Sequence, residues 1–290
     1  QEVGDDYLNT MDRRAGGRPH NACPPPNETF GILLEASELP RPPIAELSKA
    51  SITDNTFHVE LQSQSKEDAQ VNGTQNKYTY DSAGWKHPFV LYMDGILDEG
   101  NLGAAARSAY FFGVDAIVTP MRSSAPWSQI AIKASSGAAE AIPIFGVTTP
   151  VDFLGRSARN GWRIYASDIV PFEPVSVPEA STALSVVKPP EPVTEVVFTH
   201  SKSPKRLPID HCPLKLHPTI LMLGSEGEGL RQSLLSAAHF KVGIRAGRDT
   251  NIMGVDSLNV SAAASILCYE FSKRPRGAET LGEKVEEKLF

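Results

Sequence analysis

The chain has 290 residues, of which 41% are hydrophobic and 21% charged, so it can form a sizeable core in one large or two small domains. Its net charge of −6 excludes a uniformly basic nucleic-acid-binding protein, and any RNA-binding surface must be a local patch. Three widely spaced cysteines, Cys23, Cys212 and Cys268, argue against a disulfide framework. No apolar run reaches the ~20 residues of a membrane-spanning helix, so we expect no membrane partner.

Residues 1–86 predict an N-terminal arm or linker with little regular structure. A short apolar run at 31–35 is a candidate strand. The following residues are rich in Pro and then in Ser, Gln, Asn and Asp, which favours an extended arm with a flexible insertion at 63–76. Residues 56–61 and 77–80 can pair as a β-hairpin.

Alternating strand and helix patterns predict an ordered domain at 87–272. The predicted strands are 88–93, 115–119, 143–147, 162–167, 219–223 and 241–244, and the predicted helices are 102–112, 126–141, 150–158, 229–238 and 257–271. This order favours an α/β fold, a mostly parallel sheet covered by helices. The charged tail 273–290 has one candidate helix at 283–289.

A proline-rich insertion at about 169–217 interrupts this alternation. It is too long for an ordinary connection, and we expect a surface insertion with one strand at 195–199. Its basic run, Lys202, Lys205 and Arg206, can contact a polyanion, although a solvated loop is the simpler explanation. The spacing of His20, His211 and His217 from Cys212 does not match a metal site, so we predict none.

Asn101 and Arg107 form the first polar cluster at a junction of strand and helix. Asn101 is placed to cap the helix at 102–112. Arg107 lies six residues on, so it can share a face with the capped end. Taken alone, the pair is explained as a helix cap and a surface charge.

Two further clusters follow later strands. The turn Gly-Ser-Glu-Gly-Glu-Gly at 224–229 contains Glu226, and its carboxylates argue against a phosphate ligand. Ser257, Leu258 and Asn259 precede the last helix. Taken alone, the first is a tight turn and the second a helix cap above a small-residue face.

Together, the motifs Asn-x-Gly-x-x-x-Arg-Ser-Ala, Leu-Gly-Ser-Glu-Gly-Glu-Gly-Leu and Ser-Leu-Asn-Val-Ser resemble, in this order, the three motifs of the SpoU/TrmH branch of the SPOUT methyltransferases. The resemblance covers about residues 88–271 apart from the insertion. It implies a C-terminal trefoil knot in the sheet, a rare exception to unknotted chains, and a homodimer. It also implies ribose 2′-O-methylation of RNA with S-adenosylmethionine.

The resemblance assigns roles to individual residues. The implied catalytic residues are Asn101, Arg107, Glu226, Ser257 and Asn259, and the implied cofactor-binding residues are Leu223, Gly224, Ile244 and Leu258. The family assigns its first-motif arginine as the base, but a guanidinium stays protonated in ordinary sites. We therefore expect Arg107 to bind the target phosphate and stabilise alkoxide charge, while water or a neighbouring group takes the proton. The chain departs from the family after Ile244, where Ile-Pro-Met is replaced by Ile-Arg-Ala and a longer loop.

A second resemblance lies upstream. Gly-Gly-Arg-Pro-His-Asn at 16–21 and Phe-Gly-Ile-Leu-Leu-Glu-Ala at 30–36 resemble the linker of mitochondrial large-subunit rRNA guanosine 2′-O-methyltransferases, which follows an L30e-like RNA-binding domain. This implies the catalytic domain of an enzyme of the mitochondrial matrix. Since the chain opens with Gln1 rather than Met, we expect a targeting segment to precede it. Candidate RNA-contacting residues are Arg18, Arg107, Arg122, Lys133, Arg245 and Arg248.

Three alternatives remain. A tRNA ribose methyltransferase of the same family fits the motifs equally well. A catalytically silent RNA-binding ribosome-assembly factor would share the fold, although the intact polar set argues against it. A plain dinucleotide-binding domain would need a Gly-x-Gly-x-x-Gly fingerprint after its first strand, which residues 94–103 lack.

Overall fold

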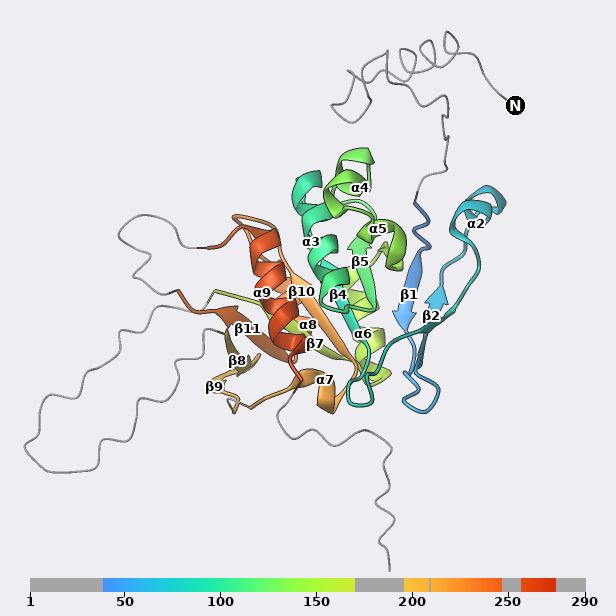
Figure 1. Ribbon diagram of the computed structural model, residues 1–290. Helices are drawn as coiled ribbons and strands as arrows, with labels where there is room; N and C mark the ends of the chain where they lie inside the picture. Colours follow the sequence, from blue (N-terminus) through green and yellow to red (C-terminus); the bar gives the residue numbers. More distant parts are fainter. Residues whose placement is uncertain (1–38, 170–195, 209, 247–256, 275–290) are drawn as a thin grey trace, which may run out of the picture. The chain divides into compact units, whose positions relative to one another are not determined.

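The structure is a computed structural model that describes residues 39–169, 196–208, 210–246 and 257–274 (Figure 1). The predicted strand at 31–35 and helix at 283–289 lie outside these residues. The strands are β1 (Ile44–Leu47), β2 (Thr56–Leu61), β3 (Lys77–Thr79), β4 (Phe89–Met93), β5 (Ala116–Pro120), β6 (Ile144–Val147), β7 (Arg163–Ser167), β8 (Val196–His200), β9 (Ser203–Arg206), β10 (Thr219–Leu223) and β11 (Phe240–Ile244). The helices are α2 (Lys66–Asn72), α3 (Glu99–Phe111), α4 (Gln129–Ser135), α5 (Ala138–Ala141), α6 (Pro150–Arg159), α7 (Pro213–Leu216), α8 (Gln232–Ala237) and α9 (Val260–Ser272).

The main sheet has eight strands in the order β6-β5-β4-β10-β7-β11-β8-β9. The first six strands in this spatial order are parallel to one another. The last two, β8 and β9, extend the sheet at the β11 edge in antiparallel pairing. The predicted mostly parallel α/β sheet is therefore confirmed. Parallel pairing also brings the carboxyl ends of β4, β10, β7 and β11 to one edge of the sheet.

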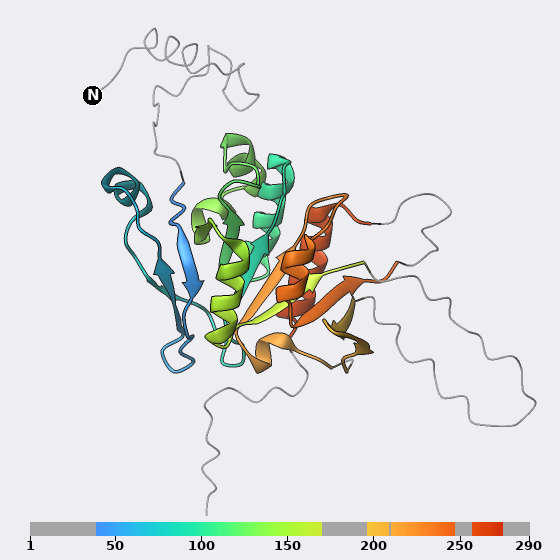
Figure 2. The same cartoon turned by 180° about the vertical axis from the view of Figure 1, so that it is seen from behind.

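Helices cover both faces of this sheet because its strands are apolar on both sides. In β4, Leu91 and Met93 pack into a core shared with α3, α4, α5 and α9, which lie in front in Figure 1. The alternate residues Val90 and Tyr92 pack into a second core with α6 and α8, seen from behind in Figure 2. This period of two is the signature of a strand buried on both faces.

The predicted arm before residue 87 contains a small antiparallel sheet, β1-β2-β3. The predicted hairpin is confirmed as β2 and β3, and the predicted flexible insertion contains α2, which Ser65 caps. Ile44 and Phe57 are fully buried in the core beside α6, and the Leu47 amide donates to Ser157 Oγ at 3.0 Å. This sheet therefore shares the core of the main domain.

Three further predictions differ from the structure. The helix at 126–141 is divided into α4 and α5, because Ser136 and Gly137 adopt left-handed backbone angles. The helix at 229–238 begins only at Gln232, because the preceding turn folds back on itself. The insertion contains β9 and α7 besides the expected strand, which is β8, and it extends the main sheet through the pairing of Phe198 with Val242.

In the described segments, Cys212 and Cys268 are free thiols, and burial raises the pKa of the Cys268 thiol to about 12. No helix among these residues is both long and apolar enough to cross a membrane.

Candidate active site

A polar cluster joins three elements at the carboxyl edge of the sheet. Glu226, in the turn after β10, accepts three hydrogen bonds at Oε1. The donors are Asn101 Nδ2 of α3 at 3.0 Å, Asn259 Nδ2 at 2.6 Å and the Val260 amide of α9 at 3.1 Å. Bonds to a carboxylate are among the stronger hydrogen bonds. One oxygen therefore fixes the ends of two helices against the glycine-rich turn.

Asn259 is held from both ends of its amide. Its Oδ1 caps α9 by accepting from the Ser261 amide at 3.0 Å and from Ser261 Oγ at 2.6 Å, and its Nδ2 also donates to Asn101 Oδ1 at 3.1 Å. The predicted cap role of Asn101 is wrong: α3 begins at Glu99, and Asp98 Oδ1 accepts from the Asn101 amide at 2.6 Å. The Asn101 side chain can therefore reach Glu226.

The glycine-rich turn is a compact loop closed on itself. Ser225 pairs with Gly229, whose amide donates to the Ser225 carbonyl at 3.0 Å. A Cβ on Gly224 would lie 2.3 Å from the Gly229 carbonyl carbon and 2.4 Å from the Leu230 nitrogen. Gly224 is thus required by this close backbone approach.

Arg107 does not join the polar cluster. It lies on the exposed side of α3, and within the described chain no hydrogen bond or ion pair connects it to Asn101, Glu226 or Asn259. Six residues on an α-helix rotate the side chain by about 600°, which separates Arg107 from Asn101 by about 120°. Ser257 is exposed in the segment before α9. The structure therefore groups Asn101, Glu226 and Asn259 and leaves Arg107 facing outward.

The residues assigned to the cofactor lie at the same edge of the sheet. Leu223 and Ile244 end the parallel strands β10 and β11, and Leu258 precedes α9 with 49% of its surface exposed. The Leu223 side chain is buried, with 1% of the residue exposed, so this residue can meet a ligand only through its backbone, whereas Ile244 and Leu258 are partly exposed. Apolar side chains beside a tightly turned backbone suit a flat, uncharged adenosine better than a phosphate group. The chemistry of this edge is that of an adenosine-binding surface, and the loop 247–256 lies outside the described segments.

An ion pair between a buried carboxylate and an exposed guanidinium, which no motif predicted, lies at the far end of this turn. Asp94, at the end of β4, is 3% exposed and accepts from Arg231 Nε at 3.1 Å, Arg231 Nη2 at 2.9 Å and the Tyr92 hydroxyl at 2.9 Å. Burial, followed by the Asp94 charge, raises the pKa of Tyr92, so the phenol remains a donor. The sequence signal that could have revealed this pair is the position of Asp94, an acidic residue directly after the buried strand β4.

Replacing Arg231 by alanine should lower the free energy of unfolding by about 1–2 kcal/mol, because the buried Asp94 carboxylate would lose two of its three hydrogen-bond donors. Urea unfolding measures this loss. Lys241→Ala is the matched control: it breaks a 2.7 Å pair with Asp168, whose carboxylate side chain is 37% exposed where that of Asp94 is 5% exposed. A pair with a solvated carboxylate contributes roughly 0–1 kcal/mol. Equal losses in the two variants would contradict a structural role for the Asp94–Arg231 pair.

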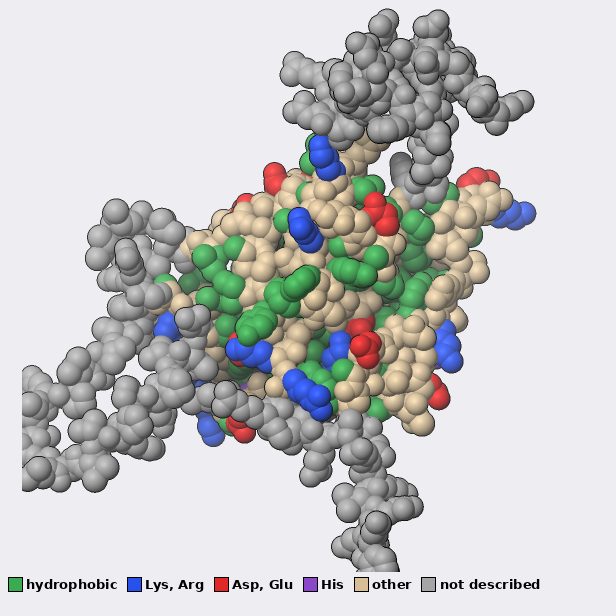
Figure 3. Space-filling model, viewed as in Figure 1, with side chains coloured by type: hydrophobic (Ala, Val, Ile, Leu, Met, Phe, Trp, Pro, Cys, Tyr) green, Lys and Arg blue, Asp and Glu red, His purple; other side chains and the backbone are tan. Residues whose placement is uncertain are grey.

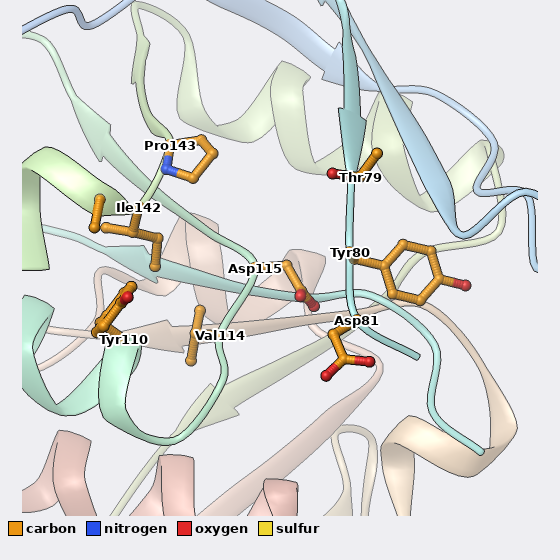
Figure 4. Close-up of a pocket in the computed structure, with 9 residues that line it drawn as sticks. Thr79, Tyr80, Asp81, Tyr110, Val114, Asp115, Ile142 and Pro143 are labelled. Carbon is orange, nitrogen blue, oxygen red and sulfur yellow. The ribbon is translucent and has the colours of Figure 1, made fainter. Parts of the chain in front are cut away.

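The cavity shown in Figure 4 lies away from this cluster. Its lining residues are Thr79, Tyr80, Asp81, Tyr110, Val114, Asp115, Ala141, Ile142 and Pro143. Asp115 precedes β5 and Pro143 precedes β6, so the cavity is at the amino ends of the parallel strands. The ring of Tyr80 points away from the other labelled side chains. The cavity at the amino ends of the strands is therefore separate from the candidate active site at their carboxyl ends.

Asp115 makes stability depend on pH. Burial raises its pKa to about 6, against the opposing effects of Lys86 and the Phe89 amide. Because the folded state holds this proton more tightly than the unfolded chain, the stabilisation is present below about pH 4 and is lost as the pH rises through about 6. Asp115→Asn should therefore match wild type near pH 4 and exceed its stability at pH 7 by on the order of 2–3 kcal/mol. Urea unfolding at both pH values tests this, and a constant difference would contradict it.

Two histidines of the insertion lie beside Tyr165. His211 Nε2 lies 2.9 Å and His217 Nε2 lies 3.4 Å from the Tyr165 hydroxyl. Burial, followed by the charge of Arg163, lowers the pKa of His217 to about 4. Among the described residues, no group of three or more His, Cys, Asp or Glu side chains has a metal-binding arrangement.

Comparison with known proteins identifies related sequences. The chain is 32% identical to rRNA methyltransferase 1, mitochondrial, of Homo sapiens over 67% of this chain and 48% of the relative. The protein of the same name from Saccharomyces cerevisiae is 34% identical over 63% of this chain and 40% of its own length. That of Schizosaccharomyces pombe is 32% identical over 93% of this chain and 73% of the relative. The chain thus spans less than half of the human and budding-yeast proteins.

Among solved structures, an rRNA methyltransferase from Sinorhizobium meliloti with bound AdoMet is 20% identical, with a TM-score of 0.44, over 71% of this chain and 69% of its own. Residues 88–269 match the SpoU rRNA Methylase family. This segment is more than half of the chain and contains all three polar clusters. The chain belongs to the SpoU rRNA methylase family.

Proposed function

We propose that this chain is the catalytic part of an enzyme that methylates a ribose 2′-hydroxyl, that of a guanosine, in mitochondrial large-subunit rRNA, with S-adenosylmethionine as methyl donor. The observation that carries the proposal is the Glu226 carboxylate, which holds Asn101 and Asn259 together at the strand ends. The family membership and the mitochondrial rRNA methyltransferases among the relatives support the substrate and the compartment, the mitochondrial matrix.

Methyl transfer depends on alignment of the two reacting groups rather than on covalent catalysis by the protein. The bound cofactor supplies a methyl group on a sulfonium, and Leu223, Gly224, Ile244 and Leu258 would hold it. The ribose hydroxyl must lie on the axis of the methyl–sulfur bond, and such alignment can contribute ~7–11 kcal/mol to lowering a barrier. The Asn101 amide, which donates one hydrogen bond to Glu226 and can donate a second, can orient the ribose together with Ser257. Asn259 is a positioning residue, because both of its amide hydrogens are engaged by Glu226 and Asn101. Glu226 acts as a positioning residue through Oε1, which accepts from three donors of α3 and α9.

Arg107 has the exposure that an RNA contact needs. Its permanently charged guanidinium can bind the target phosphate through bidentate hydrogen bonds and stabilise the developing alkoxide. Water or a neighbouring group then accepts the proton. If Arg107→Lys kept nearly full activity while Arg107→Ala lost it, charge alone would suffice and the planar guanidinium would have no special role.

The test of the proposed function is methyl transfer from labelled cofactor to transcripts of mitochondrial large-subunit rRNA and of mitochondrial tRNAs. We expect label in the rRNA at one ribose, where it blocks alkaline cleavage of the adjacent phosphodiester. Label only in tRNA would move the enzyme to the tRNA branch of the family. RNA binding with no label in either would support a silent assembly factor.

We propose a homodimer formed by α3 and α9. Large apolar side chains are exposed on these helices, including Tyr110 (54%), Phe111 (78%) and Tyr269 (53%). Figure 3 shows hydrophobic side chains gathered on this face. Contiguous apolar patches of this kind mark interfaces. Light scattering should give twice the monomer mass, and Phe111→Asp should give the monomer mass; an unchanged dimer would place the interface elsewhere.

We propose that the C-terminal part of the sheet contains a trefoil knot. The order of the strands supports it: β10 lies between β4 and β7, β11 lies beyond β7, and α9 returns to α3, where Ser265 Oγ lies 2.7 Å from Ser108 Oγ. Pulling single molecules by their ends tests the knot. The unfolded end-to-end length of a knotted chain should be shorter than the contour length of the same chain without a knot. An end-to-end length equal to the full contour length would exclude the knot.

A further inference from the structure

A second pocket lies at the amino ends of β7 and β11, the edge of the sheet opposite Glu226. Arg163 begins β7, Phe240 begins β11, and the hairpin of the insertion contributes His200 and Lys202. The cavity has a volume of about 570 Å³, and its lining is Arg163, His200, Lys202, Ser236, Ala237, Ala238, His239 and Phe240. The insertion therefore helps to build a surface outside the polar cluster.

The charge of this pocket contrasts with the net charge of −6 of the whole chain. Arg163, Lys202 and His200 are all exposed, and none of the eight lining residues is acidic. In the described segments no ion pair neutralises Arg163 or Lys202. Beside them, burial and then the Arg163 charge lower the pKa of His239. A local positive potential of this kind attracts anions.

Phe240 adds an aromatic surface to the cations. Phe240 is partly buried and packs against the core, where its ring is stacked on the buried Tyr165 with centroids 4.8 Å apart and an interplanar angle of 22°. On the pocket side, the His200 ring lies 5.6 Å from it. His217 lies nearly parallel to it at 6.3 Å. These contacts fix the ring before any ligand arrives. A fixed aromatic ring beside exposed cations is the arrangement that binds single-stranded nucleic acid, with the base stacked and the phosphates paired.

We propose that this basic pocket is a second RNA-binding site, which holds a single-stranded segment of the same RNA with phosphates on Arg163 and Lys202 and a base against Phe240. The inference rests on the proposed function and deepens it. The strands β7 and β11 have five residues each, and at ~3.3 Å per residue they separate the pocket from the carboxyl edge by only roughly 15 Å. One RNA can therefore occupy both sites.

The test compares two double variants of equal charge. Arg163→Ala/Lys202→Ala removes the two cations of the pocket. Lys66→Ala/Lys77→Ala removes two exposed lysines of α2 and β3 on the small sheet. Fluorescence anisotropy with a single-stranded RNA dodecamer and with the rRNA transcript gives affinities over a range of salt concentrations. Titration of S-adenosylmethionine shows whether each variant keeps its cofactor site.

We expect the pocket variant to bind RNA about ten-fold or more weakly, and its salt slope to fall by about 1.4, or ~0.7 for each lost phosphate contact. The control variant should match wild type, and all three proteins should bind the cofactor equally. Phe240→Leu should weaken RNA binding about ten-fold through lost stacking, with an unchanged salt slope.

The failures can be told apart. If wild type methylates and binds RNA but the pocket variant behaves like the control, the second site is excluded and the proposed function stands. If wild type neither binds nor methylates any RNA, both proposals are overturned.

Discussion

Replacing Glu226 by alanine should abolish most methyl transfer while the chain stays folded. The substitution leaves Asn101 Nδ2, Asn259 Nδ2 and the Val260 amide without their shared acceptor. Because the cluster is largely exposed to water, we expect a stability loss of only about 1–2 kcal/mol. The loss of positioning matters more, since a displacement of ~1 Å costs on the order of 100-fold in rate. Initial rates of methyl transfer and urea unfolding measure the two effects.

Two variants make this prediction specific. Glu226→Gln retains an oxygen that can accept from the same donors without a charge, so its activity should lie between those of wild type and Glu226→Ala. Glu228→Gln removes the neighbouring carboxylate of the same turn, which is exposed, and it should leave the rate nearly unchanged. Equal losses at Glu226 and Glu228 would indicate that the turn needs negative charge rather than the observed hydrogen bonds.

Gly224→Ala should destroy the cofactor site with the addition of one methyl group. The new Cβ would lie 2.3 Å from the Gly229 carbonyl carbon and 2.6 Å from its oxygen. Both atoms are backbone, so the turn must open. We expect a loss of roughly 1–3 kcal/mol in stability and no measurable heat of S-adenosylmethionine binding.

Gly155→Ala is the control for this substitution. Gly155 lies inside α6, and its added Cβ would have open space around it. This change should raise stability by about 0.5–1 kcal/mol, because alanine favours the helix and restricts the unfolded chain. Cofactor binding should stay as in wild type. Wild-type cofactor affinity in Gly224→Ala would remove the turn from the cofactor site.

The sequence alone predicted most of the parallel sheet. Continuous apolar runs such as those of β4 and β10 are buried on both faces, and they need no knowledge of their neighbours to be recognised. Helix boundaries were predicted less well. Asp98 rather than Asn101 caps α3, and the alternatives could not be separated locally because both residues are good caps.

By itself, the sequence determined which residue types follow the buried strands, and hence the three motifs and the family. Only the tertiary structure decided which of these residues meet. It joined Glu226 to Asn101 and Asn259, residues that are 125 and 33 positions away along the chain, and it left Arg107 on the outer side of α3. It also paired Asp94 with Arg231 and set the insertion's hairpin beside Phe240. The physical reason is that strand order is set by long-range packing, which no local pattern encodes.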